Sequence, residues 1–535
     1  MANLVSPKSL FYDYNMPRGK QLITILILFL LILPALKLMF QKDLFPSQDG
    51  LYHTARIKEF DTDIKNFQIP PRLAPNLENQ IGYPLFIVNY QLPYYFAEIF
   101  TLPTNNPEFA FKAVMSASLI LSAIFAFLLF RNFASEAASL VGAIFFTYLP
   151  YRFANLYDRG SFGESVALMF VPLVLLAFHK LKGSPKYSIP LLTIALFGLI
   201  ASHTVIFMVF APFFIFYFLL IVKPDLKIFK KTVVASILAI ILSSFQLIPS
   251  VFEKKYLVFD SALTNLYNGH FLNLYQLLRI PHSDLNLGTP FQIGLTASLV
   301  IIISLILKKN LREILMLLTI ALSLFLTLPI SKFLWQNLPL LNFILYPWRF
   351  LSLIALSSSF LAVYLVDSSK KYTRELAAIL IILTIFASRH YFLKPIQLRP
   401  NPPTANLTTS NEFDTIWSNW QTFMPRPLIS TNPDSNIVLS GQKPFDVTAK
   451  VTNTQKSQII IRKLYFPGWI LKINGQQRKI DTKDGLISTP LDPGSWQIEA
   501  YFTESRLRFT SDLLTLLGFL FLAAFIIKPN LAEKI

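Results

Sequence analysis

The chain has 535 residues, of which 53% are hydrophobic and only 15% are charged, and its mean hydropathy is +0.50. A soluble domain carries about a quarter charged residues, so this composition excludes one and indicates a polytopic membrane protein. The net charge of +18 comes from short basic clusters between apolar runs rather than from one basic face, which argues against a nucleic-acid partner. The absence of cysteine excludes disulfides and thiolate metal sites.

The chain starts with a basic segment ahead of its first long apolar run. Lys8, Arg18 and Lys20 precede residues 21–40, a run that is too long for a signal peptide and has no small-residue cleavage site after it, so we expect an uncleaved signal anchor. About twelve runs have the length and composition of transmembrane helices. They are residues 21–40, 109–130, 135–150, 165–180, 187–201, 204–222, 232–249, 291–307, 313–329, 348–366, 376–392 and 510–527.

The loops between these runs differ in charge on the two sides of the membrane. With the N-terminus inside, every inner loop and the C-terminal tail carry Lys or Arg, as the positive-inside rule requires. We therefore expect a protein of the cytoplasmic membrane with both termini in the cytoplasm and a large first outer loop, residues 41–108. Within it, residues 81–102 are apolar, but Pro84 and Pro93 favour an interfacial or re-entrant segment over a span.

The composition changes after residue 392. Prolines between Pro395 and Pro403 predict a stiff linker, and short alternating segments with an Asn474-Gly475 turn predict a β-rich domain. The predicted organisation is a membrane domain (1–392), an extracytoplasmic β-rich domain (393–509), and a final transmembrane helix with a cytoplasmic tail (510–535).

The start of the first outer loop contains three residues that can do chemistry. Asp49, His53 and Arg56 have the spacing i, i+4 and i+7, so on a helix they share one face that can bind a phosphate and take a proton. The alternatives are an N-cap role for Asp49, an interfacial histidine, and an Arg56 that snorkels or pairs with Glu59. Asp49 and His53 together could also hold a divalent cation.

A second cluster, residues 157–164, lies just before an apolar helix. Arg159 could bind a phosphate near the helix N-terminus, with Glu164 orienting Arg159 or a sugar hydroxyl. The alternative is a capping box formed by Ser161 and Glu164. His203, between two apolar half-runs, would either line a cavity or cap the break between them.

Arg349, which follows Pro347 and Trp348, is either an interfacial anchor or a cation for a lipid-linked phosphate. The weaker candidates, with no diagnostic spacing, lie in the fourth outer loop and are Asp260, His270, His282 and Asp284. The topology puts all these residues on the outer side, where one shared cavity could gather them. ATP-binding, dinucleotide and zinc-protease motifs are absent, so the substrate must arrive through the lipid or from outside.

Several short motifs in this order resemble those of a known class. The chain resembles the GT-C class of membrane glycosyltransferases and, more narrowly, the bacterial membrane proteins labelled as related to 6-pyruvoyl-tetrahydropterin synthase, a label that implies no pterin chemistry. The segments that carry the resemblance are 49–53, 158–164, 202–203, 346–350 and 465–469.

This resemblance implies a GT-C-like all-α membrane fold of about twelve helices with an outer β-rich domain. It implies transfer of a sugar from a polyprenyl-phosphate donor to a glycan, lipid or protein acceptor outside the membrane, with inversion expected for a direct displacement. In GT-C enzymes an acid in the first outer loop is the base or a metal ligand, and Asp49 occupies that place, with His53 where a second acid is often found.

The site expected from these arguments has two parts. The catalytic candidates are Asp49, His53 and Glu164, and the substrate- or phosphate-binding candidates are Arg56, Arg159, His203 and Arg349. The sequence assigns no definite cofactor, and Mg²⁺ or Mn²⁺ held by Asp49 and His53 stays open. The alternative functions are a transporter or flippase of a lipid-linked glycan and a non-catalytic scaffold of a cell-envelope complex; we see no internal repeat of the kind many transporters have.

Overall fold

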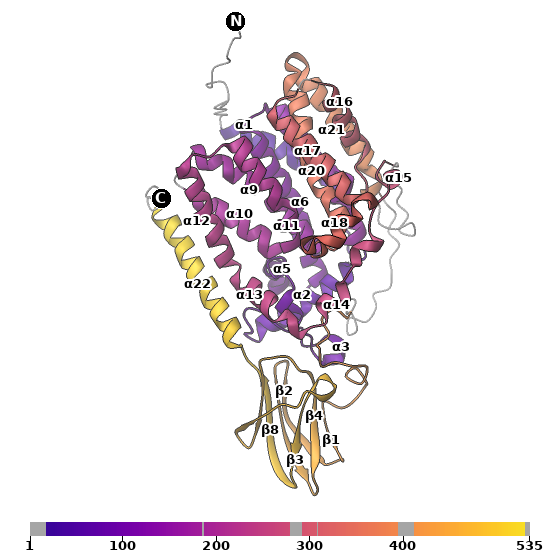
Figure 1. Cartoon of the computed structure of the whole chain (residues 1–535), viewed down its shortest axis with the longest axis vertical. Helices are drawn as coiled ribbons and strands as arrows, with labels where there is room; N and C mark the ends of the chain where they lie inside the picture. Colours follow the sequence, from indigo (N-terminus) through magenta and orange to yellow (C-terminus); the bar gives the residue numbers. More distant parts are fainter. Residues whose placement is uncertain (1–17, 184–186, 279–290, 308, 394–410, 530–535) are drawn as a thin grey trace.

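A computed structural model describes residues 18–183, 187–278, 291–307, 309–393 and 411–529. It is an elongated molecule with a helical body and a β domain at one end (Figure 1). This arrangement confirms the predicted fold class, a polytopic helical membrane protein with a C-terminal β-rich domain. The predicted proline linker and the weaker candidates His282 and Asp284 lie outside the described residues.

Within the described residues, seven helices are long and apolar enough to cross a membrane, and the number rises to nine if each of two bent pairs is one span. The seven are formed by α1 (Arg18–Ile32) with its continuation Leu33–Phe40, α6 (Pro107–Phe130), α9 (Phe162–Gly183), α11 (Thr204–Tyr217) with its continuation Phe218–Val222, α20 (Leu351–Ser368) with the preceding turn Pro347–Phe350, α21 (Thr373–Phe392) with the preceding turn Lys370–Tyr372, and α22 (Arg506–Ile527). The bent pairs are α12 (Leu226–Leu242) with α13 (Ser244–Phe252), at 67°, and α17 (Leu311–Thr327) with Pro329–Asn337, which includes α18 (Lys332–Asn337), at 81°.

The other three predicted spans are shorter apolar helices. They are α7 (Glu136–Tyr148), α10 (Ser188–Ser202) and α16 (Leu295–Ile306), of 13, 15 and 12 residues. A straight transmembrane helix needs about 20 residues, so these three fall short of that length. All twelve predicted spans are helical, but fewer of them have the full spanning length.

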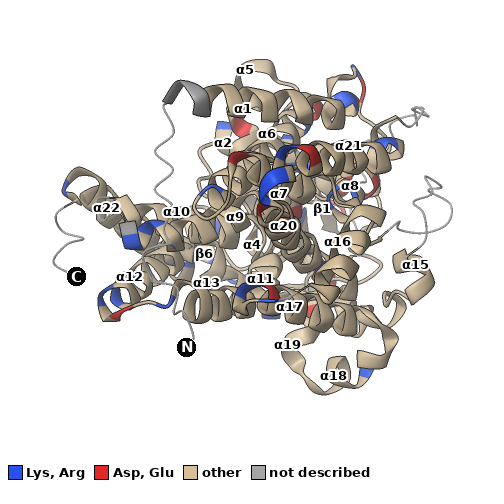
Figure 2. Ribbon diagram, turned by 90° about the horizontal axis from the view of Figure 1, so that it is seen from above, with Lys and Arg blue, Asp and Glu red and all other residues tan. Residues whose placement is uncertain are grey.

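The helices differ in how much of their surface is buried against other parts of the protein. In α9, 94% of the most apolar stretch is buried, whereas in α22 only 22% is. The helices α6 and α10 pack against α9, and α7 and α17 pack against α20. A helix that is apolar all round suits either a protein core or lipid, so α9 forms the core and α22 presents most of its surface to lipid. Figure 2 shows a helical body that is mostly uncharged, with Lys and Arg near the beginning of α12.

The predicted first outer loop, residues 41–108, contains four helices next to the β domain. They are α2 (Gly50–Lys65), α3 (Leu77–Gln80), α4 (Leu85–Val88) and α5 (Leu92–Thr104). As predicted, residues 81–102 do not form one span, because the chain breaks near Pro84 and again before Pro93. Tyr83 and Tyr94 are almost fully buried, so this segment is part of the protein core.

The β domain consists of two antiparallel sheets. One has the strand order β1-β4-β7 and the other β2-β3-β8-β5-β6. Alternate apolar side chains, among them Val447, Ile459 and Ile498, form the core between the sheets. Asn474 and Gly475, with φ of 51° and 78°, make the predicted tight turn between β5 and β6. The strands are β1 (Ile429–Asn432), β2 (Asn436–Lys443), β3 (Asp446–Asn453), β4 (Ser457–Leu464), β5 (Trp469–Ile473), β6 (Gln476–Arg478), β7 (Leu486–Leu491) and β8 (Gly494–Phe502).

A buried ionic network connects Arg72, in the predicted first outer loop, to the end of the β domain and to α22. The guanidinium of Arg72 is fully buried and contacts Glu504 at 3.0 Å and Asp512 at 2.7 Å. Arg508 lies 3.2 Å from Glu504 and 3.6 Å from Glu253. Because several carboxylates face these two guanidiniums, the β domain and the helical body share a charge-paired junction.

Candidate functional site

Two motifs far apart in sequence meet at the beginning of α2. The Asp49 amide donates to the Arg159 carbonyl at 2.7 Å, and the Gln48 amide donates to the Asp158 carbonyl at 3.0 Å. Gly160 permits this contact, since its φ is +66° and an added Cβ would lie 2.6 Å from Ser47 Oγ. The backbone therefore brings the two predicted clusters together.

A buried carboxylate organises the second cluster. Glu164, in the first turn of α9, is fully buried and accepts from Asn155 Nδ2 at 2.7 Å, from Arg159 Nη1 at 3.0 Å and from the Tyr151 hydroxyl. Asn155 and Arg159 belong to a π-helical turn, Ala154–Arg159, a conformation often found at functional sites. The capping-box alternative is wrong, because the Ser161 amide donates to the Asn155 carbonyl and Glu164 binds side chains instead.

Arg349 approaches the same carboxylate from another part of the chain. Its Nε lies 3.5 Å from Glu164 Oε2, and its Nη1 donates to the Ile344 carbonyl at 2.5 Å. The guanidiniums of Arg349 and Arg159 lie 4.8 Å and 5.8 Å from the ring centre of Tyr346. Arg349 is buried, so the interfacial-anchor alternative is wrong, and two cations flank one buried carboxylate.

Asp49 differs from Glu164 in its surroundings. Its side chain is 38% exposed, and its Oδ2 lies 4.0 Å from Arg159 Nη2, beyond hydrogen-bond distance. It occupies the N-cap position of α2, but its side chain makes no capping hydrogen bond. Burial acts to lower the pKa of Arg159, but Glu164 and Asp49 outweigh it and raise the pKa, so the guanidinium stays charged. The site thus combines an accessible carboxylate with an adjacent, permanently charged guanidinium.

His53 and Arg56 lie deeper, among aromatic side chains. His53 Nδ1 is 3.0 Å from the Tyr94 hydroxyl, and the imidazole stacks on Phe111 at 6.3 Å. Burial, with the charges of Arg56 and Arg159, lowers the pKa of His53 well below its usual value, so the ring is neutral at pH 7. The guanidinium of Arg56 lies 5.6 Å from the Phe413 ring, and the Glu59 carboxylate accepts from the Asn76 amide instead of pairing with Arg56.

His203 separates α10 from α11. Its Nδ1 accepts from the Ile206 amide at 3.2 Å, so it caps α11, and its ring lies 5.4 Å from that of Tyr90. Of its two predicted roles the capping role is thus observed. Its ring also borders the aromatic group around His53, since Tyr90 stacks on Tyr94 at 6.0 Å.

The segment that precedes the β domain, residues 411–428, packs against this part of the site, and we call it the strap. The Asp414 carbonyl accepts from the Val258 amide at 2.9 Å, the Asp414 side chain accepts from the Tyr83 hydroxyl, and Phe413 packs over Arg56. The β domain is therefore connected directly to the helices that hold the site.

Some contributors to the site were not predicted. Tyr151, Asn155 and Tyr346 contact the charged residues, and Tyr94 contacts His53. Tyr346 belongs to the segment 346–350 and Asn155 lies just before the cluster 157–164, so their positions could have identified them. Tyr94 is 41 residues from His53, and no periodicity connects the two.

The predicted metal pair, Asp49 and His53, does not fit a divalent cation well. Among the described residues no three or more His, Asp or Glu side chains form a group that could hold a metal ion. His53 Nδ1 faces the Tyr94 hydroxyl in an aromatic environment, whereas Mg²⁺ and Mn²⁺ favour carboxylate, carbonyl and water oxygens. Asp49 is the one member of the pair with suitable chemistry.

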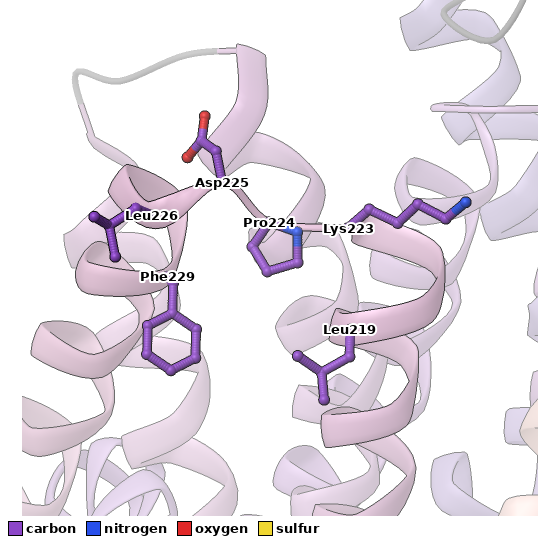
Figure 3. Close-up of a pocket in the computed structure, with 6 residues that line it drawn as sticks. All are labelled: Leu219, Lys223, Pro224, Asp225, Leu226 and Phe229. Carbon is purple, nitrogen blue, oxygen red and sulfur yellow. The ribbon is translucent and has the colours of Figure 1, made fainter.

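A separate hollow of about 500 Å³ lies between α11 and α12 (Figure 3). Leu219, Leu226 and Phe229 line it together with Lys223, Pro224 and Asp225, at the loop predicted to face the cytoplasm. None of the candidate site residues contributes to it, so it is not part of the site.

Comparison with known proteins gives a family and distant structural similarities. A family model described as "6-pyruvoyl-tetrahydropterin synthase related domain; membrane protein" matches residues 88–393, more than half of the chain. An uncharacterized protein of Lactococcus lactis subsp. cremoris (strain MG1363) is 26% identical over 259 residues, which cover 46% of this chain and 41% of the relative. This chain thus matches less than half the length of that relative.

Two solved structures share part of the architecture. The arabinofuranosyltransferase AftD from Mycobacteria has 13% identity and a TM-score of 0.40, covering 70% of this chain and 26% of that one. The oligosaccharyltransferase of Archaeoglobus fulgidus in the apo form has 13% identity and a TM-score of 0.39, covering 70% of this chain and 56% of that one. At such low TM-scores the function has to be argued from the site itself.

Proposed function

The chain belongs to the 6-pyruvoyl-tetrahydropterin synthase related family of membrane proteins, and we propose that it is a membrane glycosyltransferase. In this proposal it transfers a sugar from a polyprenyl-phosphate-linked donor to a glycan, lipid or protein acceptor on the outer side of the cytoplasmic membrane. The supporting observation is the 4.0 Å separation between the accessible carboxylate of Asp49 and the buried guanidinium of Arg159.

The proposed reaction needs a base and a phosphate-binding group close together. An acceptor hydroxyl attacks the anomeric carbon, its proton passes to Asp49, and the bond from that carbon to the phosphate oxygen breaks. The leaving polyprenyl phosphate gains negative charge, which Arg159 and Arg349 stabilise as it develops. A single displacement of this kind inverts the anomeric centre.

Glu164 has a different role in this proposal. As a fully buried carboxylate that accepts from Tyr151, Asn155 and Arg159, it is occupied by donors and is not available as a base. It holds Arg159 and Arg349 in fixed orientations between which a phosphate binds, so we regard it as a positioning residue. His53 and His203 support α2 and the break before α11 around this centre, and Arg56 holds the strap through Phe413.

A divalent cation is not part of the proposed steps, because His53 is a poor partner for Asp49 in binding one. A cation that used Asp49 and substrate phosphate oxygens would make activity dependent on added Mg²⁺ or Mn²⁺. Titration of the purified protein with these ions after treatment with a chelator tests this.

The function is tested with purified protein in lipid nanodiscs. Mass spectrometry of the copurified lipid is expected to identify a polyprenyl-phosphate species, and incubation with a labelled polyprenyl-phosphate sugar is expected to release the sugar onto a cell-envelope acceptor. Movement of the intact donor across vesicles without cleavage would support a flippase instead. The proposal is refuted if no polyprenyl lipid copurifies with the protein and no donor that is tried supports transfer.

A further inference from the structure

We propose that the β domain binds a neutral oligosaccharide in a groove on the outer face of the β1-β4-β7 sheet, at the turn that bears Trp420. That this glycan is the acceptor of the reaction rests on the proposed function, whereas binding itself does not. The groove has a volume of about 100 Å³ and is lined by Arg426, Asn432, Gln458, Ile460, Asp484, Leu486 and Ser488.

Strand register explains the mixed character of the groove. Asn432 pairs with Gln458 across β1 and β4, and Ile460 pairs with Ser488 across β4 and β7. Since side chains alternate along a strand, Ile459 points into the core while Gln458 and Ile460 face the groove. The result is an apolar floor with polar side chains around it, which suits a sugar ring with its C–H faces and hydroxyl rim.

The polar side chains are held in place and keep capacity for a ligand. Gln458 Nε2 donates to Asp481 Oδ2 at 3.1 Å and to Ser488 Oγ at 3.3 Å, which leaves the Gln458 carbonyl oxygen as an acceptor. Asp484 Oδ1 accepts from Asn419 at 3.1 Å, and Arg426 Nη2 donates to the Gln421 carbonyl at 2.7 Å. The second oxygen of Asp484 and the other guanidinium N–H groups can therefore meet sugar hydroxyls. One cation and one anion line the groove, so a neutral ligand fits better than an anionic one.

An exposed tryptophan lies on the turn that contacts the groove residue Asp484. Trp420 is 72% exposed, and its turn is fixed to the groove because Asn419 and Thr422 both donate to Asp484. Tryptophan is amphipathic and is enriched at interfaces. A solvent-exposed indole on a turn fixed by hydrogen bonds is therefore suited to stacking on the apolar face of a sugar. The core Trp469 is buried in the domain and has no such freedom.

The groove is connected to the candidate site through the chain. The same segment carries Phe413, which packs on Arg56, and Trp417, which stacks on Tyr256 at 5.7 Å. A glycan bound beside Trp420 is thus held on the domain that the strap joins to the base and the phosphate-binding residues.

The test uses the full chain in nanodiscs and four linear neutral probes: cellohexaose, maltohexaose, chitohexaose and mannohexaose. Calorimetric titration is expected to detect binding of at least one probe, weakened about fivefold or more by Trp420→Ala and also by Gln458→Ala. Val438→Ala, at a 57% exposed position on the other sheet, is the matched control and is expected to bind as the natural chain does.

The outcomes separate this inference from the proposed function. The proposed glycan site is refuted if none of the four probes binds in the millimolar range. It is also refuted if the natural chain and Trp420→Ala bind equally well. If binding depends on Trp420 but the protein transfers no sugar, the result supports the glycan site and contradicts the proposed glycosyltransferase function.

Discussion

Replacing Asp49 with asparagine separates catalysis from structure at this site. The substitution keeps the size of the side chain and removes its charge and its ability to take a proton. Two backbone hydrogen bonds of Asp49 are unaffected. The Asp49 amide donates to the Arg159 carbonyl, and the Asp49 carbonyl accepts from the His53 amide. The change is therefore confined to one carboxylate.

The expected magnitudes follow from exposure and distance. Because the Asp49 side chain is 38% exposed and lies 4.0 Å from Arg159, loss of the ion pair is expected to change the free energy of unfolding by less than about 1 kcal/mol. Loss of a general base is expected to lower kcat by about 10²- to 10⁴-fold. A large kinetic effect with almost no effect on stability is the signature of a base.

The assay measures sugar transfer from the donor lipid identified by mass spectrometry, together with thermal unfolding of the same sample. Asp43→Asn, at an exposed acid six residues before Asp49, is the matched control and should retain full activity. Full turnover by Asp49→Asn would refute the base assignment. A similar loss in both variants would indicate a general effect of charge in the loop.

Three further substitutions test other parts of the reasoning. Arg349→Ala is expected to raise KM for the donor about tenfold or more, since a charged contact to phosphate is lost; an unchanged KM and rate would contradict that role. Glu164→Ala leaves two guanidiniums buried without their carboxylate, so we expect about 3–5 kcal/mol of destabilisation, measured as a lower Tm, and an unchanged Tm would contradict the organising role. Burial and the neighbouring Asp61 raise the pKa of Glu98 from 4.5 to about 8, so the folded protein retains a proton that the unfolded chain loses, and stability should fall as pH rises through this window. Glu98→Gln should flatten that dependence when Tm is compared at the two ends of the window, and a slope equal to that of the natural chain would show that other groups cause it.

The architecture was readable from the sequence because its signals are long or local. Each predicted span corresponds to a helix, and the Asn474-Gly475 turn lies where its dipeptide predicts. The sequence did not show which apolar runs are bent or shortened. A break such as the 67° bend between α12 and α13 depends on packing against other helices, which hydropathy does not encode.

The site was predictable as a set of residues but not as an arrangement. The positive-inside rule put Asp49, Arg159, Glu164 and Arg349 on one side, and the structure joins them by ion pairs. The helical periodicity of Asp49, His53 and Arg56 was also correct, since α2 begins at Gly50. It could not show that His53 and Arg56 lie among Tyr94, Phe111 and Phe413, because those contacts come from distant segments.

The two acids of the site show why arrangement decides function. In sequence, Asp49 and Glu164 are both catalytic candidates at the beginning of a helix, Asp49 as the base or a metal ligand and Glu164 as the residue that orients Arg159 or a sugar hydroxyl. In the structure, Glu164 is fully buried, accepts hydrogen bonds from Tyr151, Asn155 and Arg159, and forms an ion pair with Arg349. The Asp49 side chain is partly exposed, and its ion pair with Arg159 is longer than a hydrogen bond. A carboxylate occupied by donors can orient cations but cannot readily take a proton, and an accessible one beside a fixed guanidinium can. The division of labour between positioning and proton transfer therefore follows from burial, which sequence spacing alone does not determine.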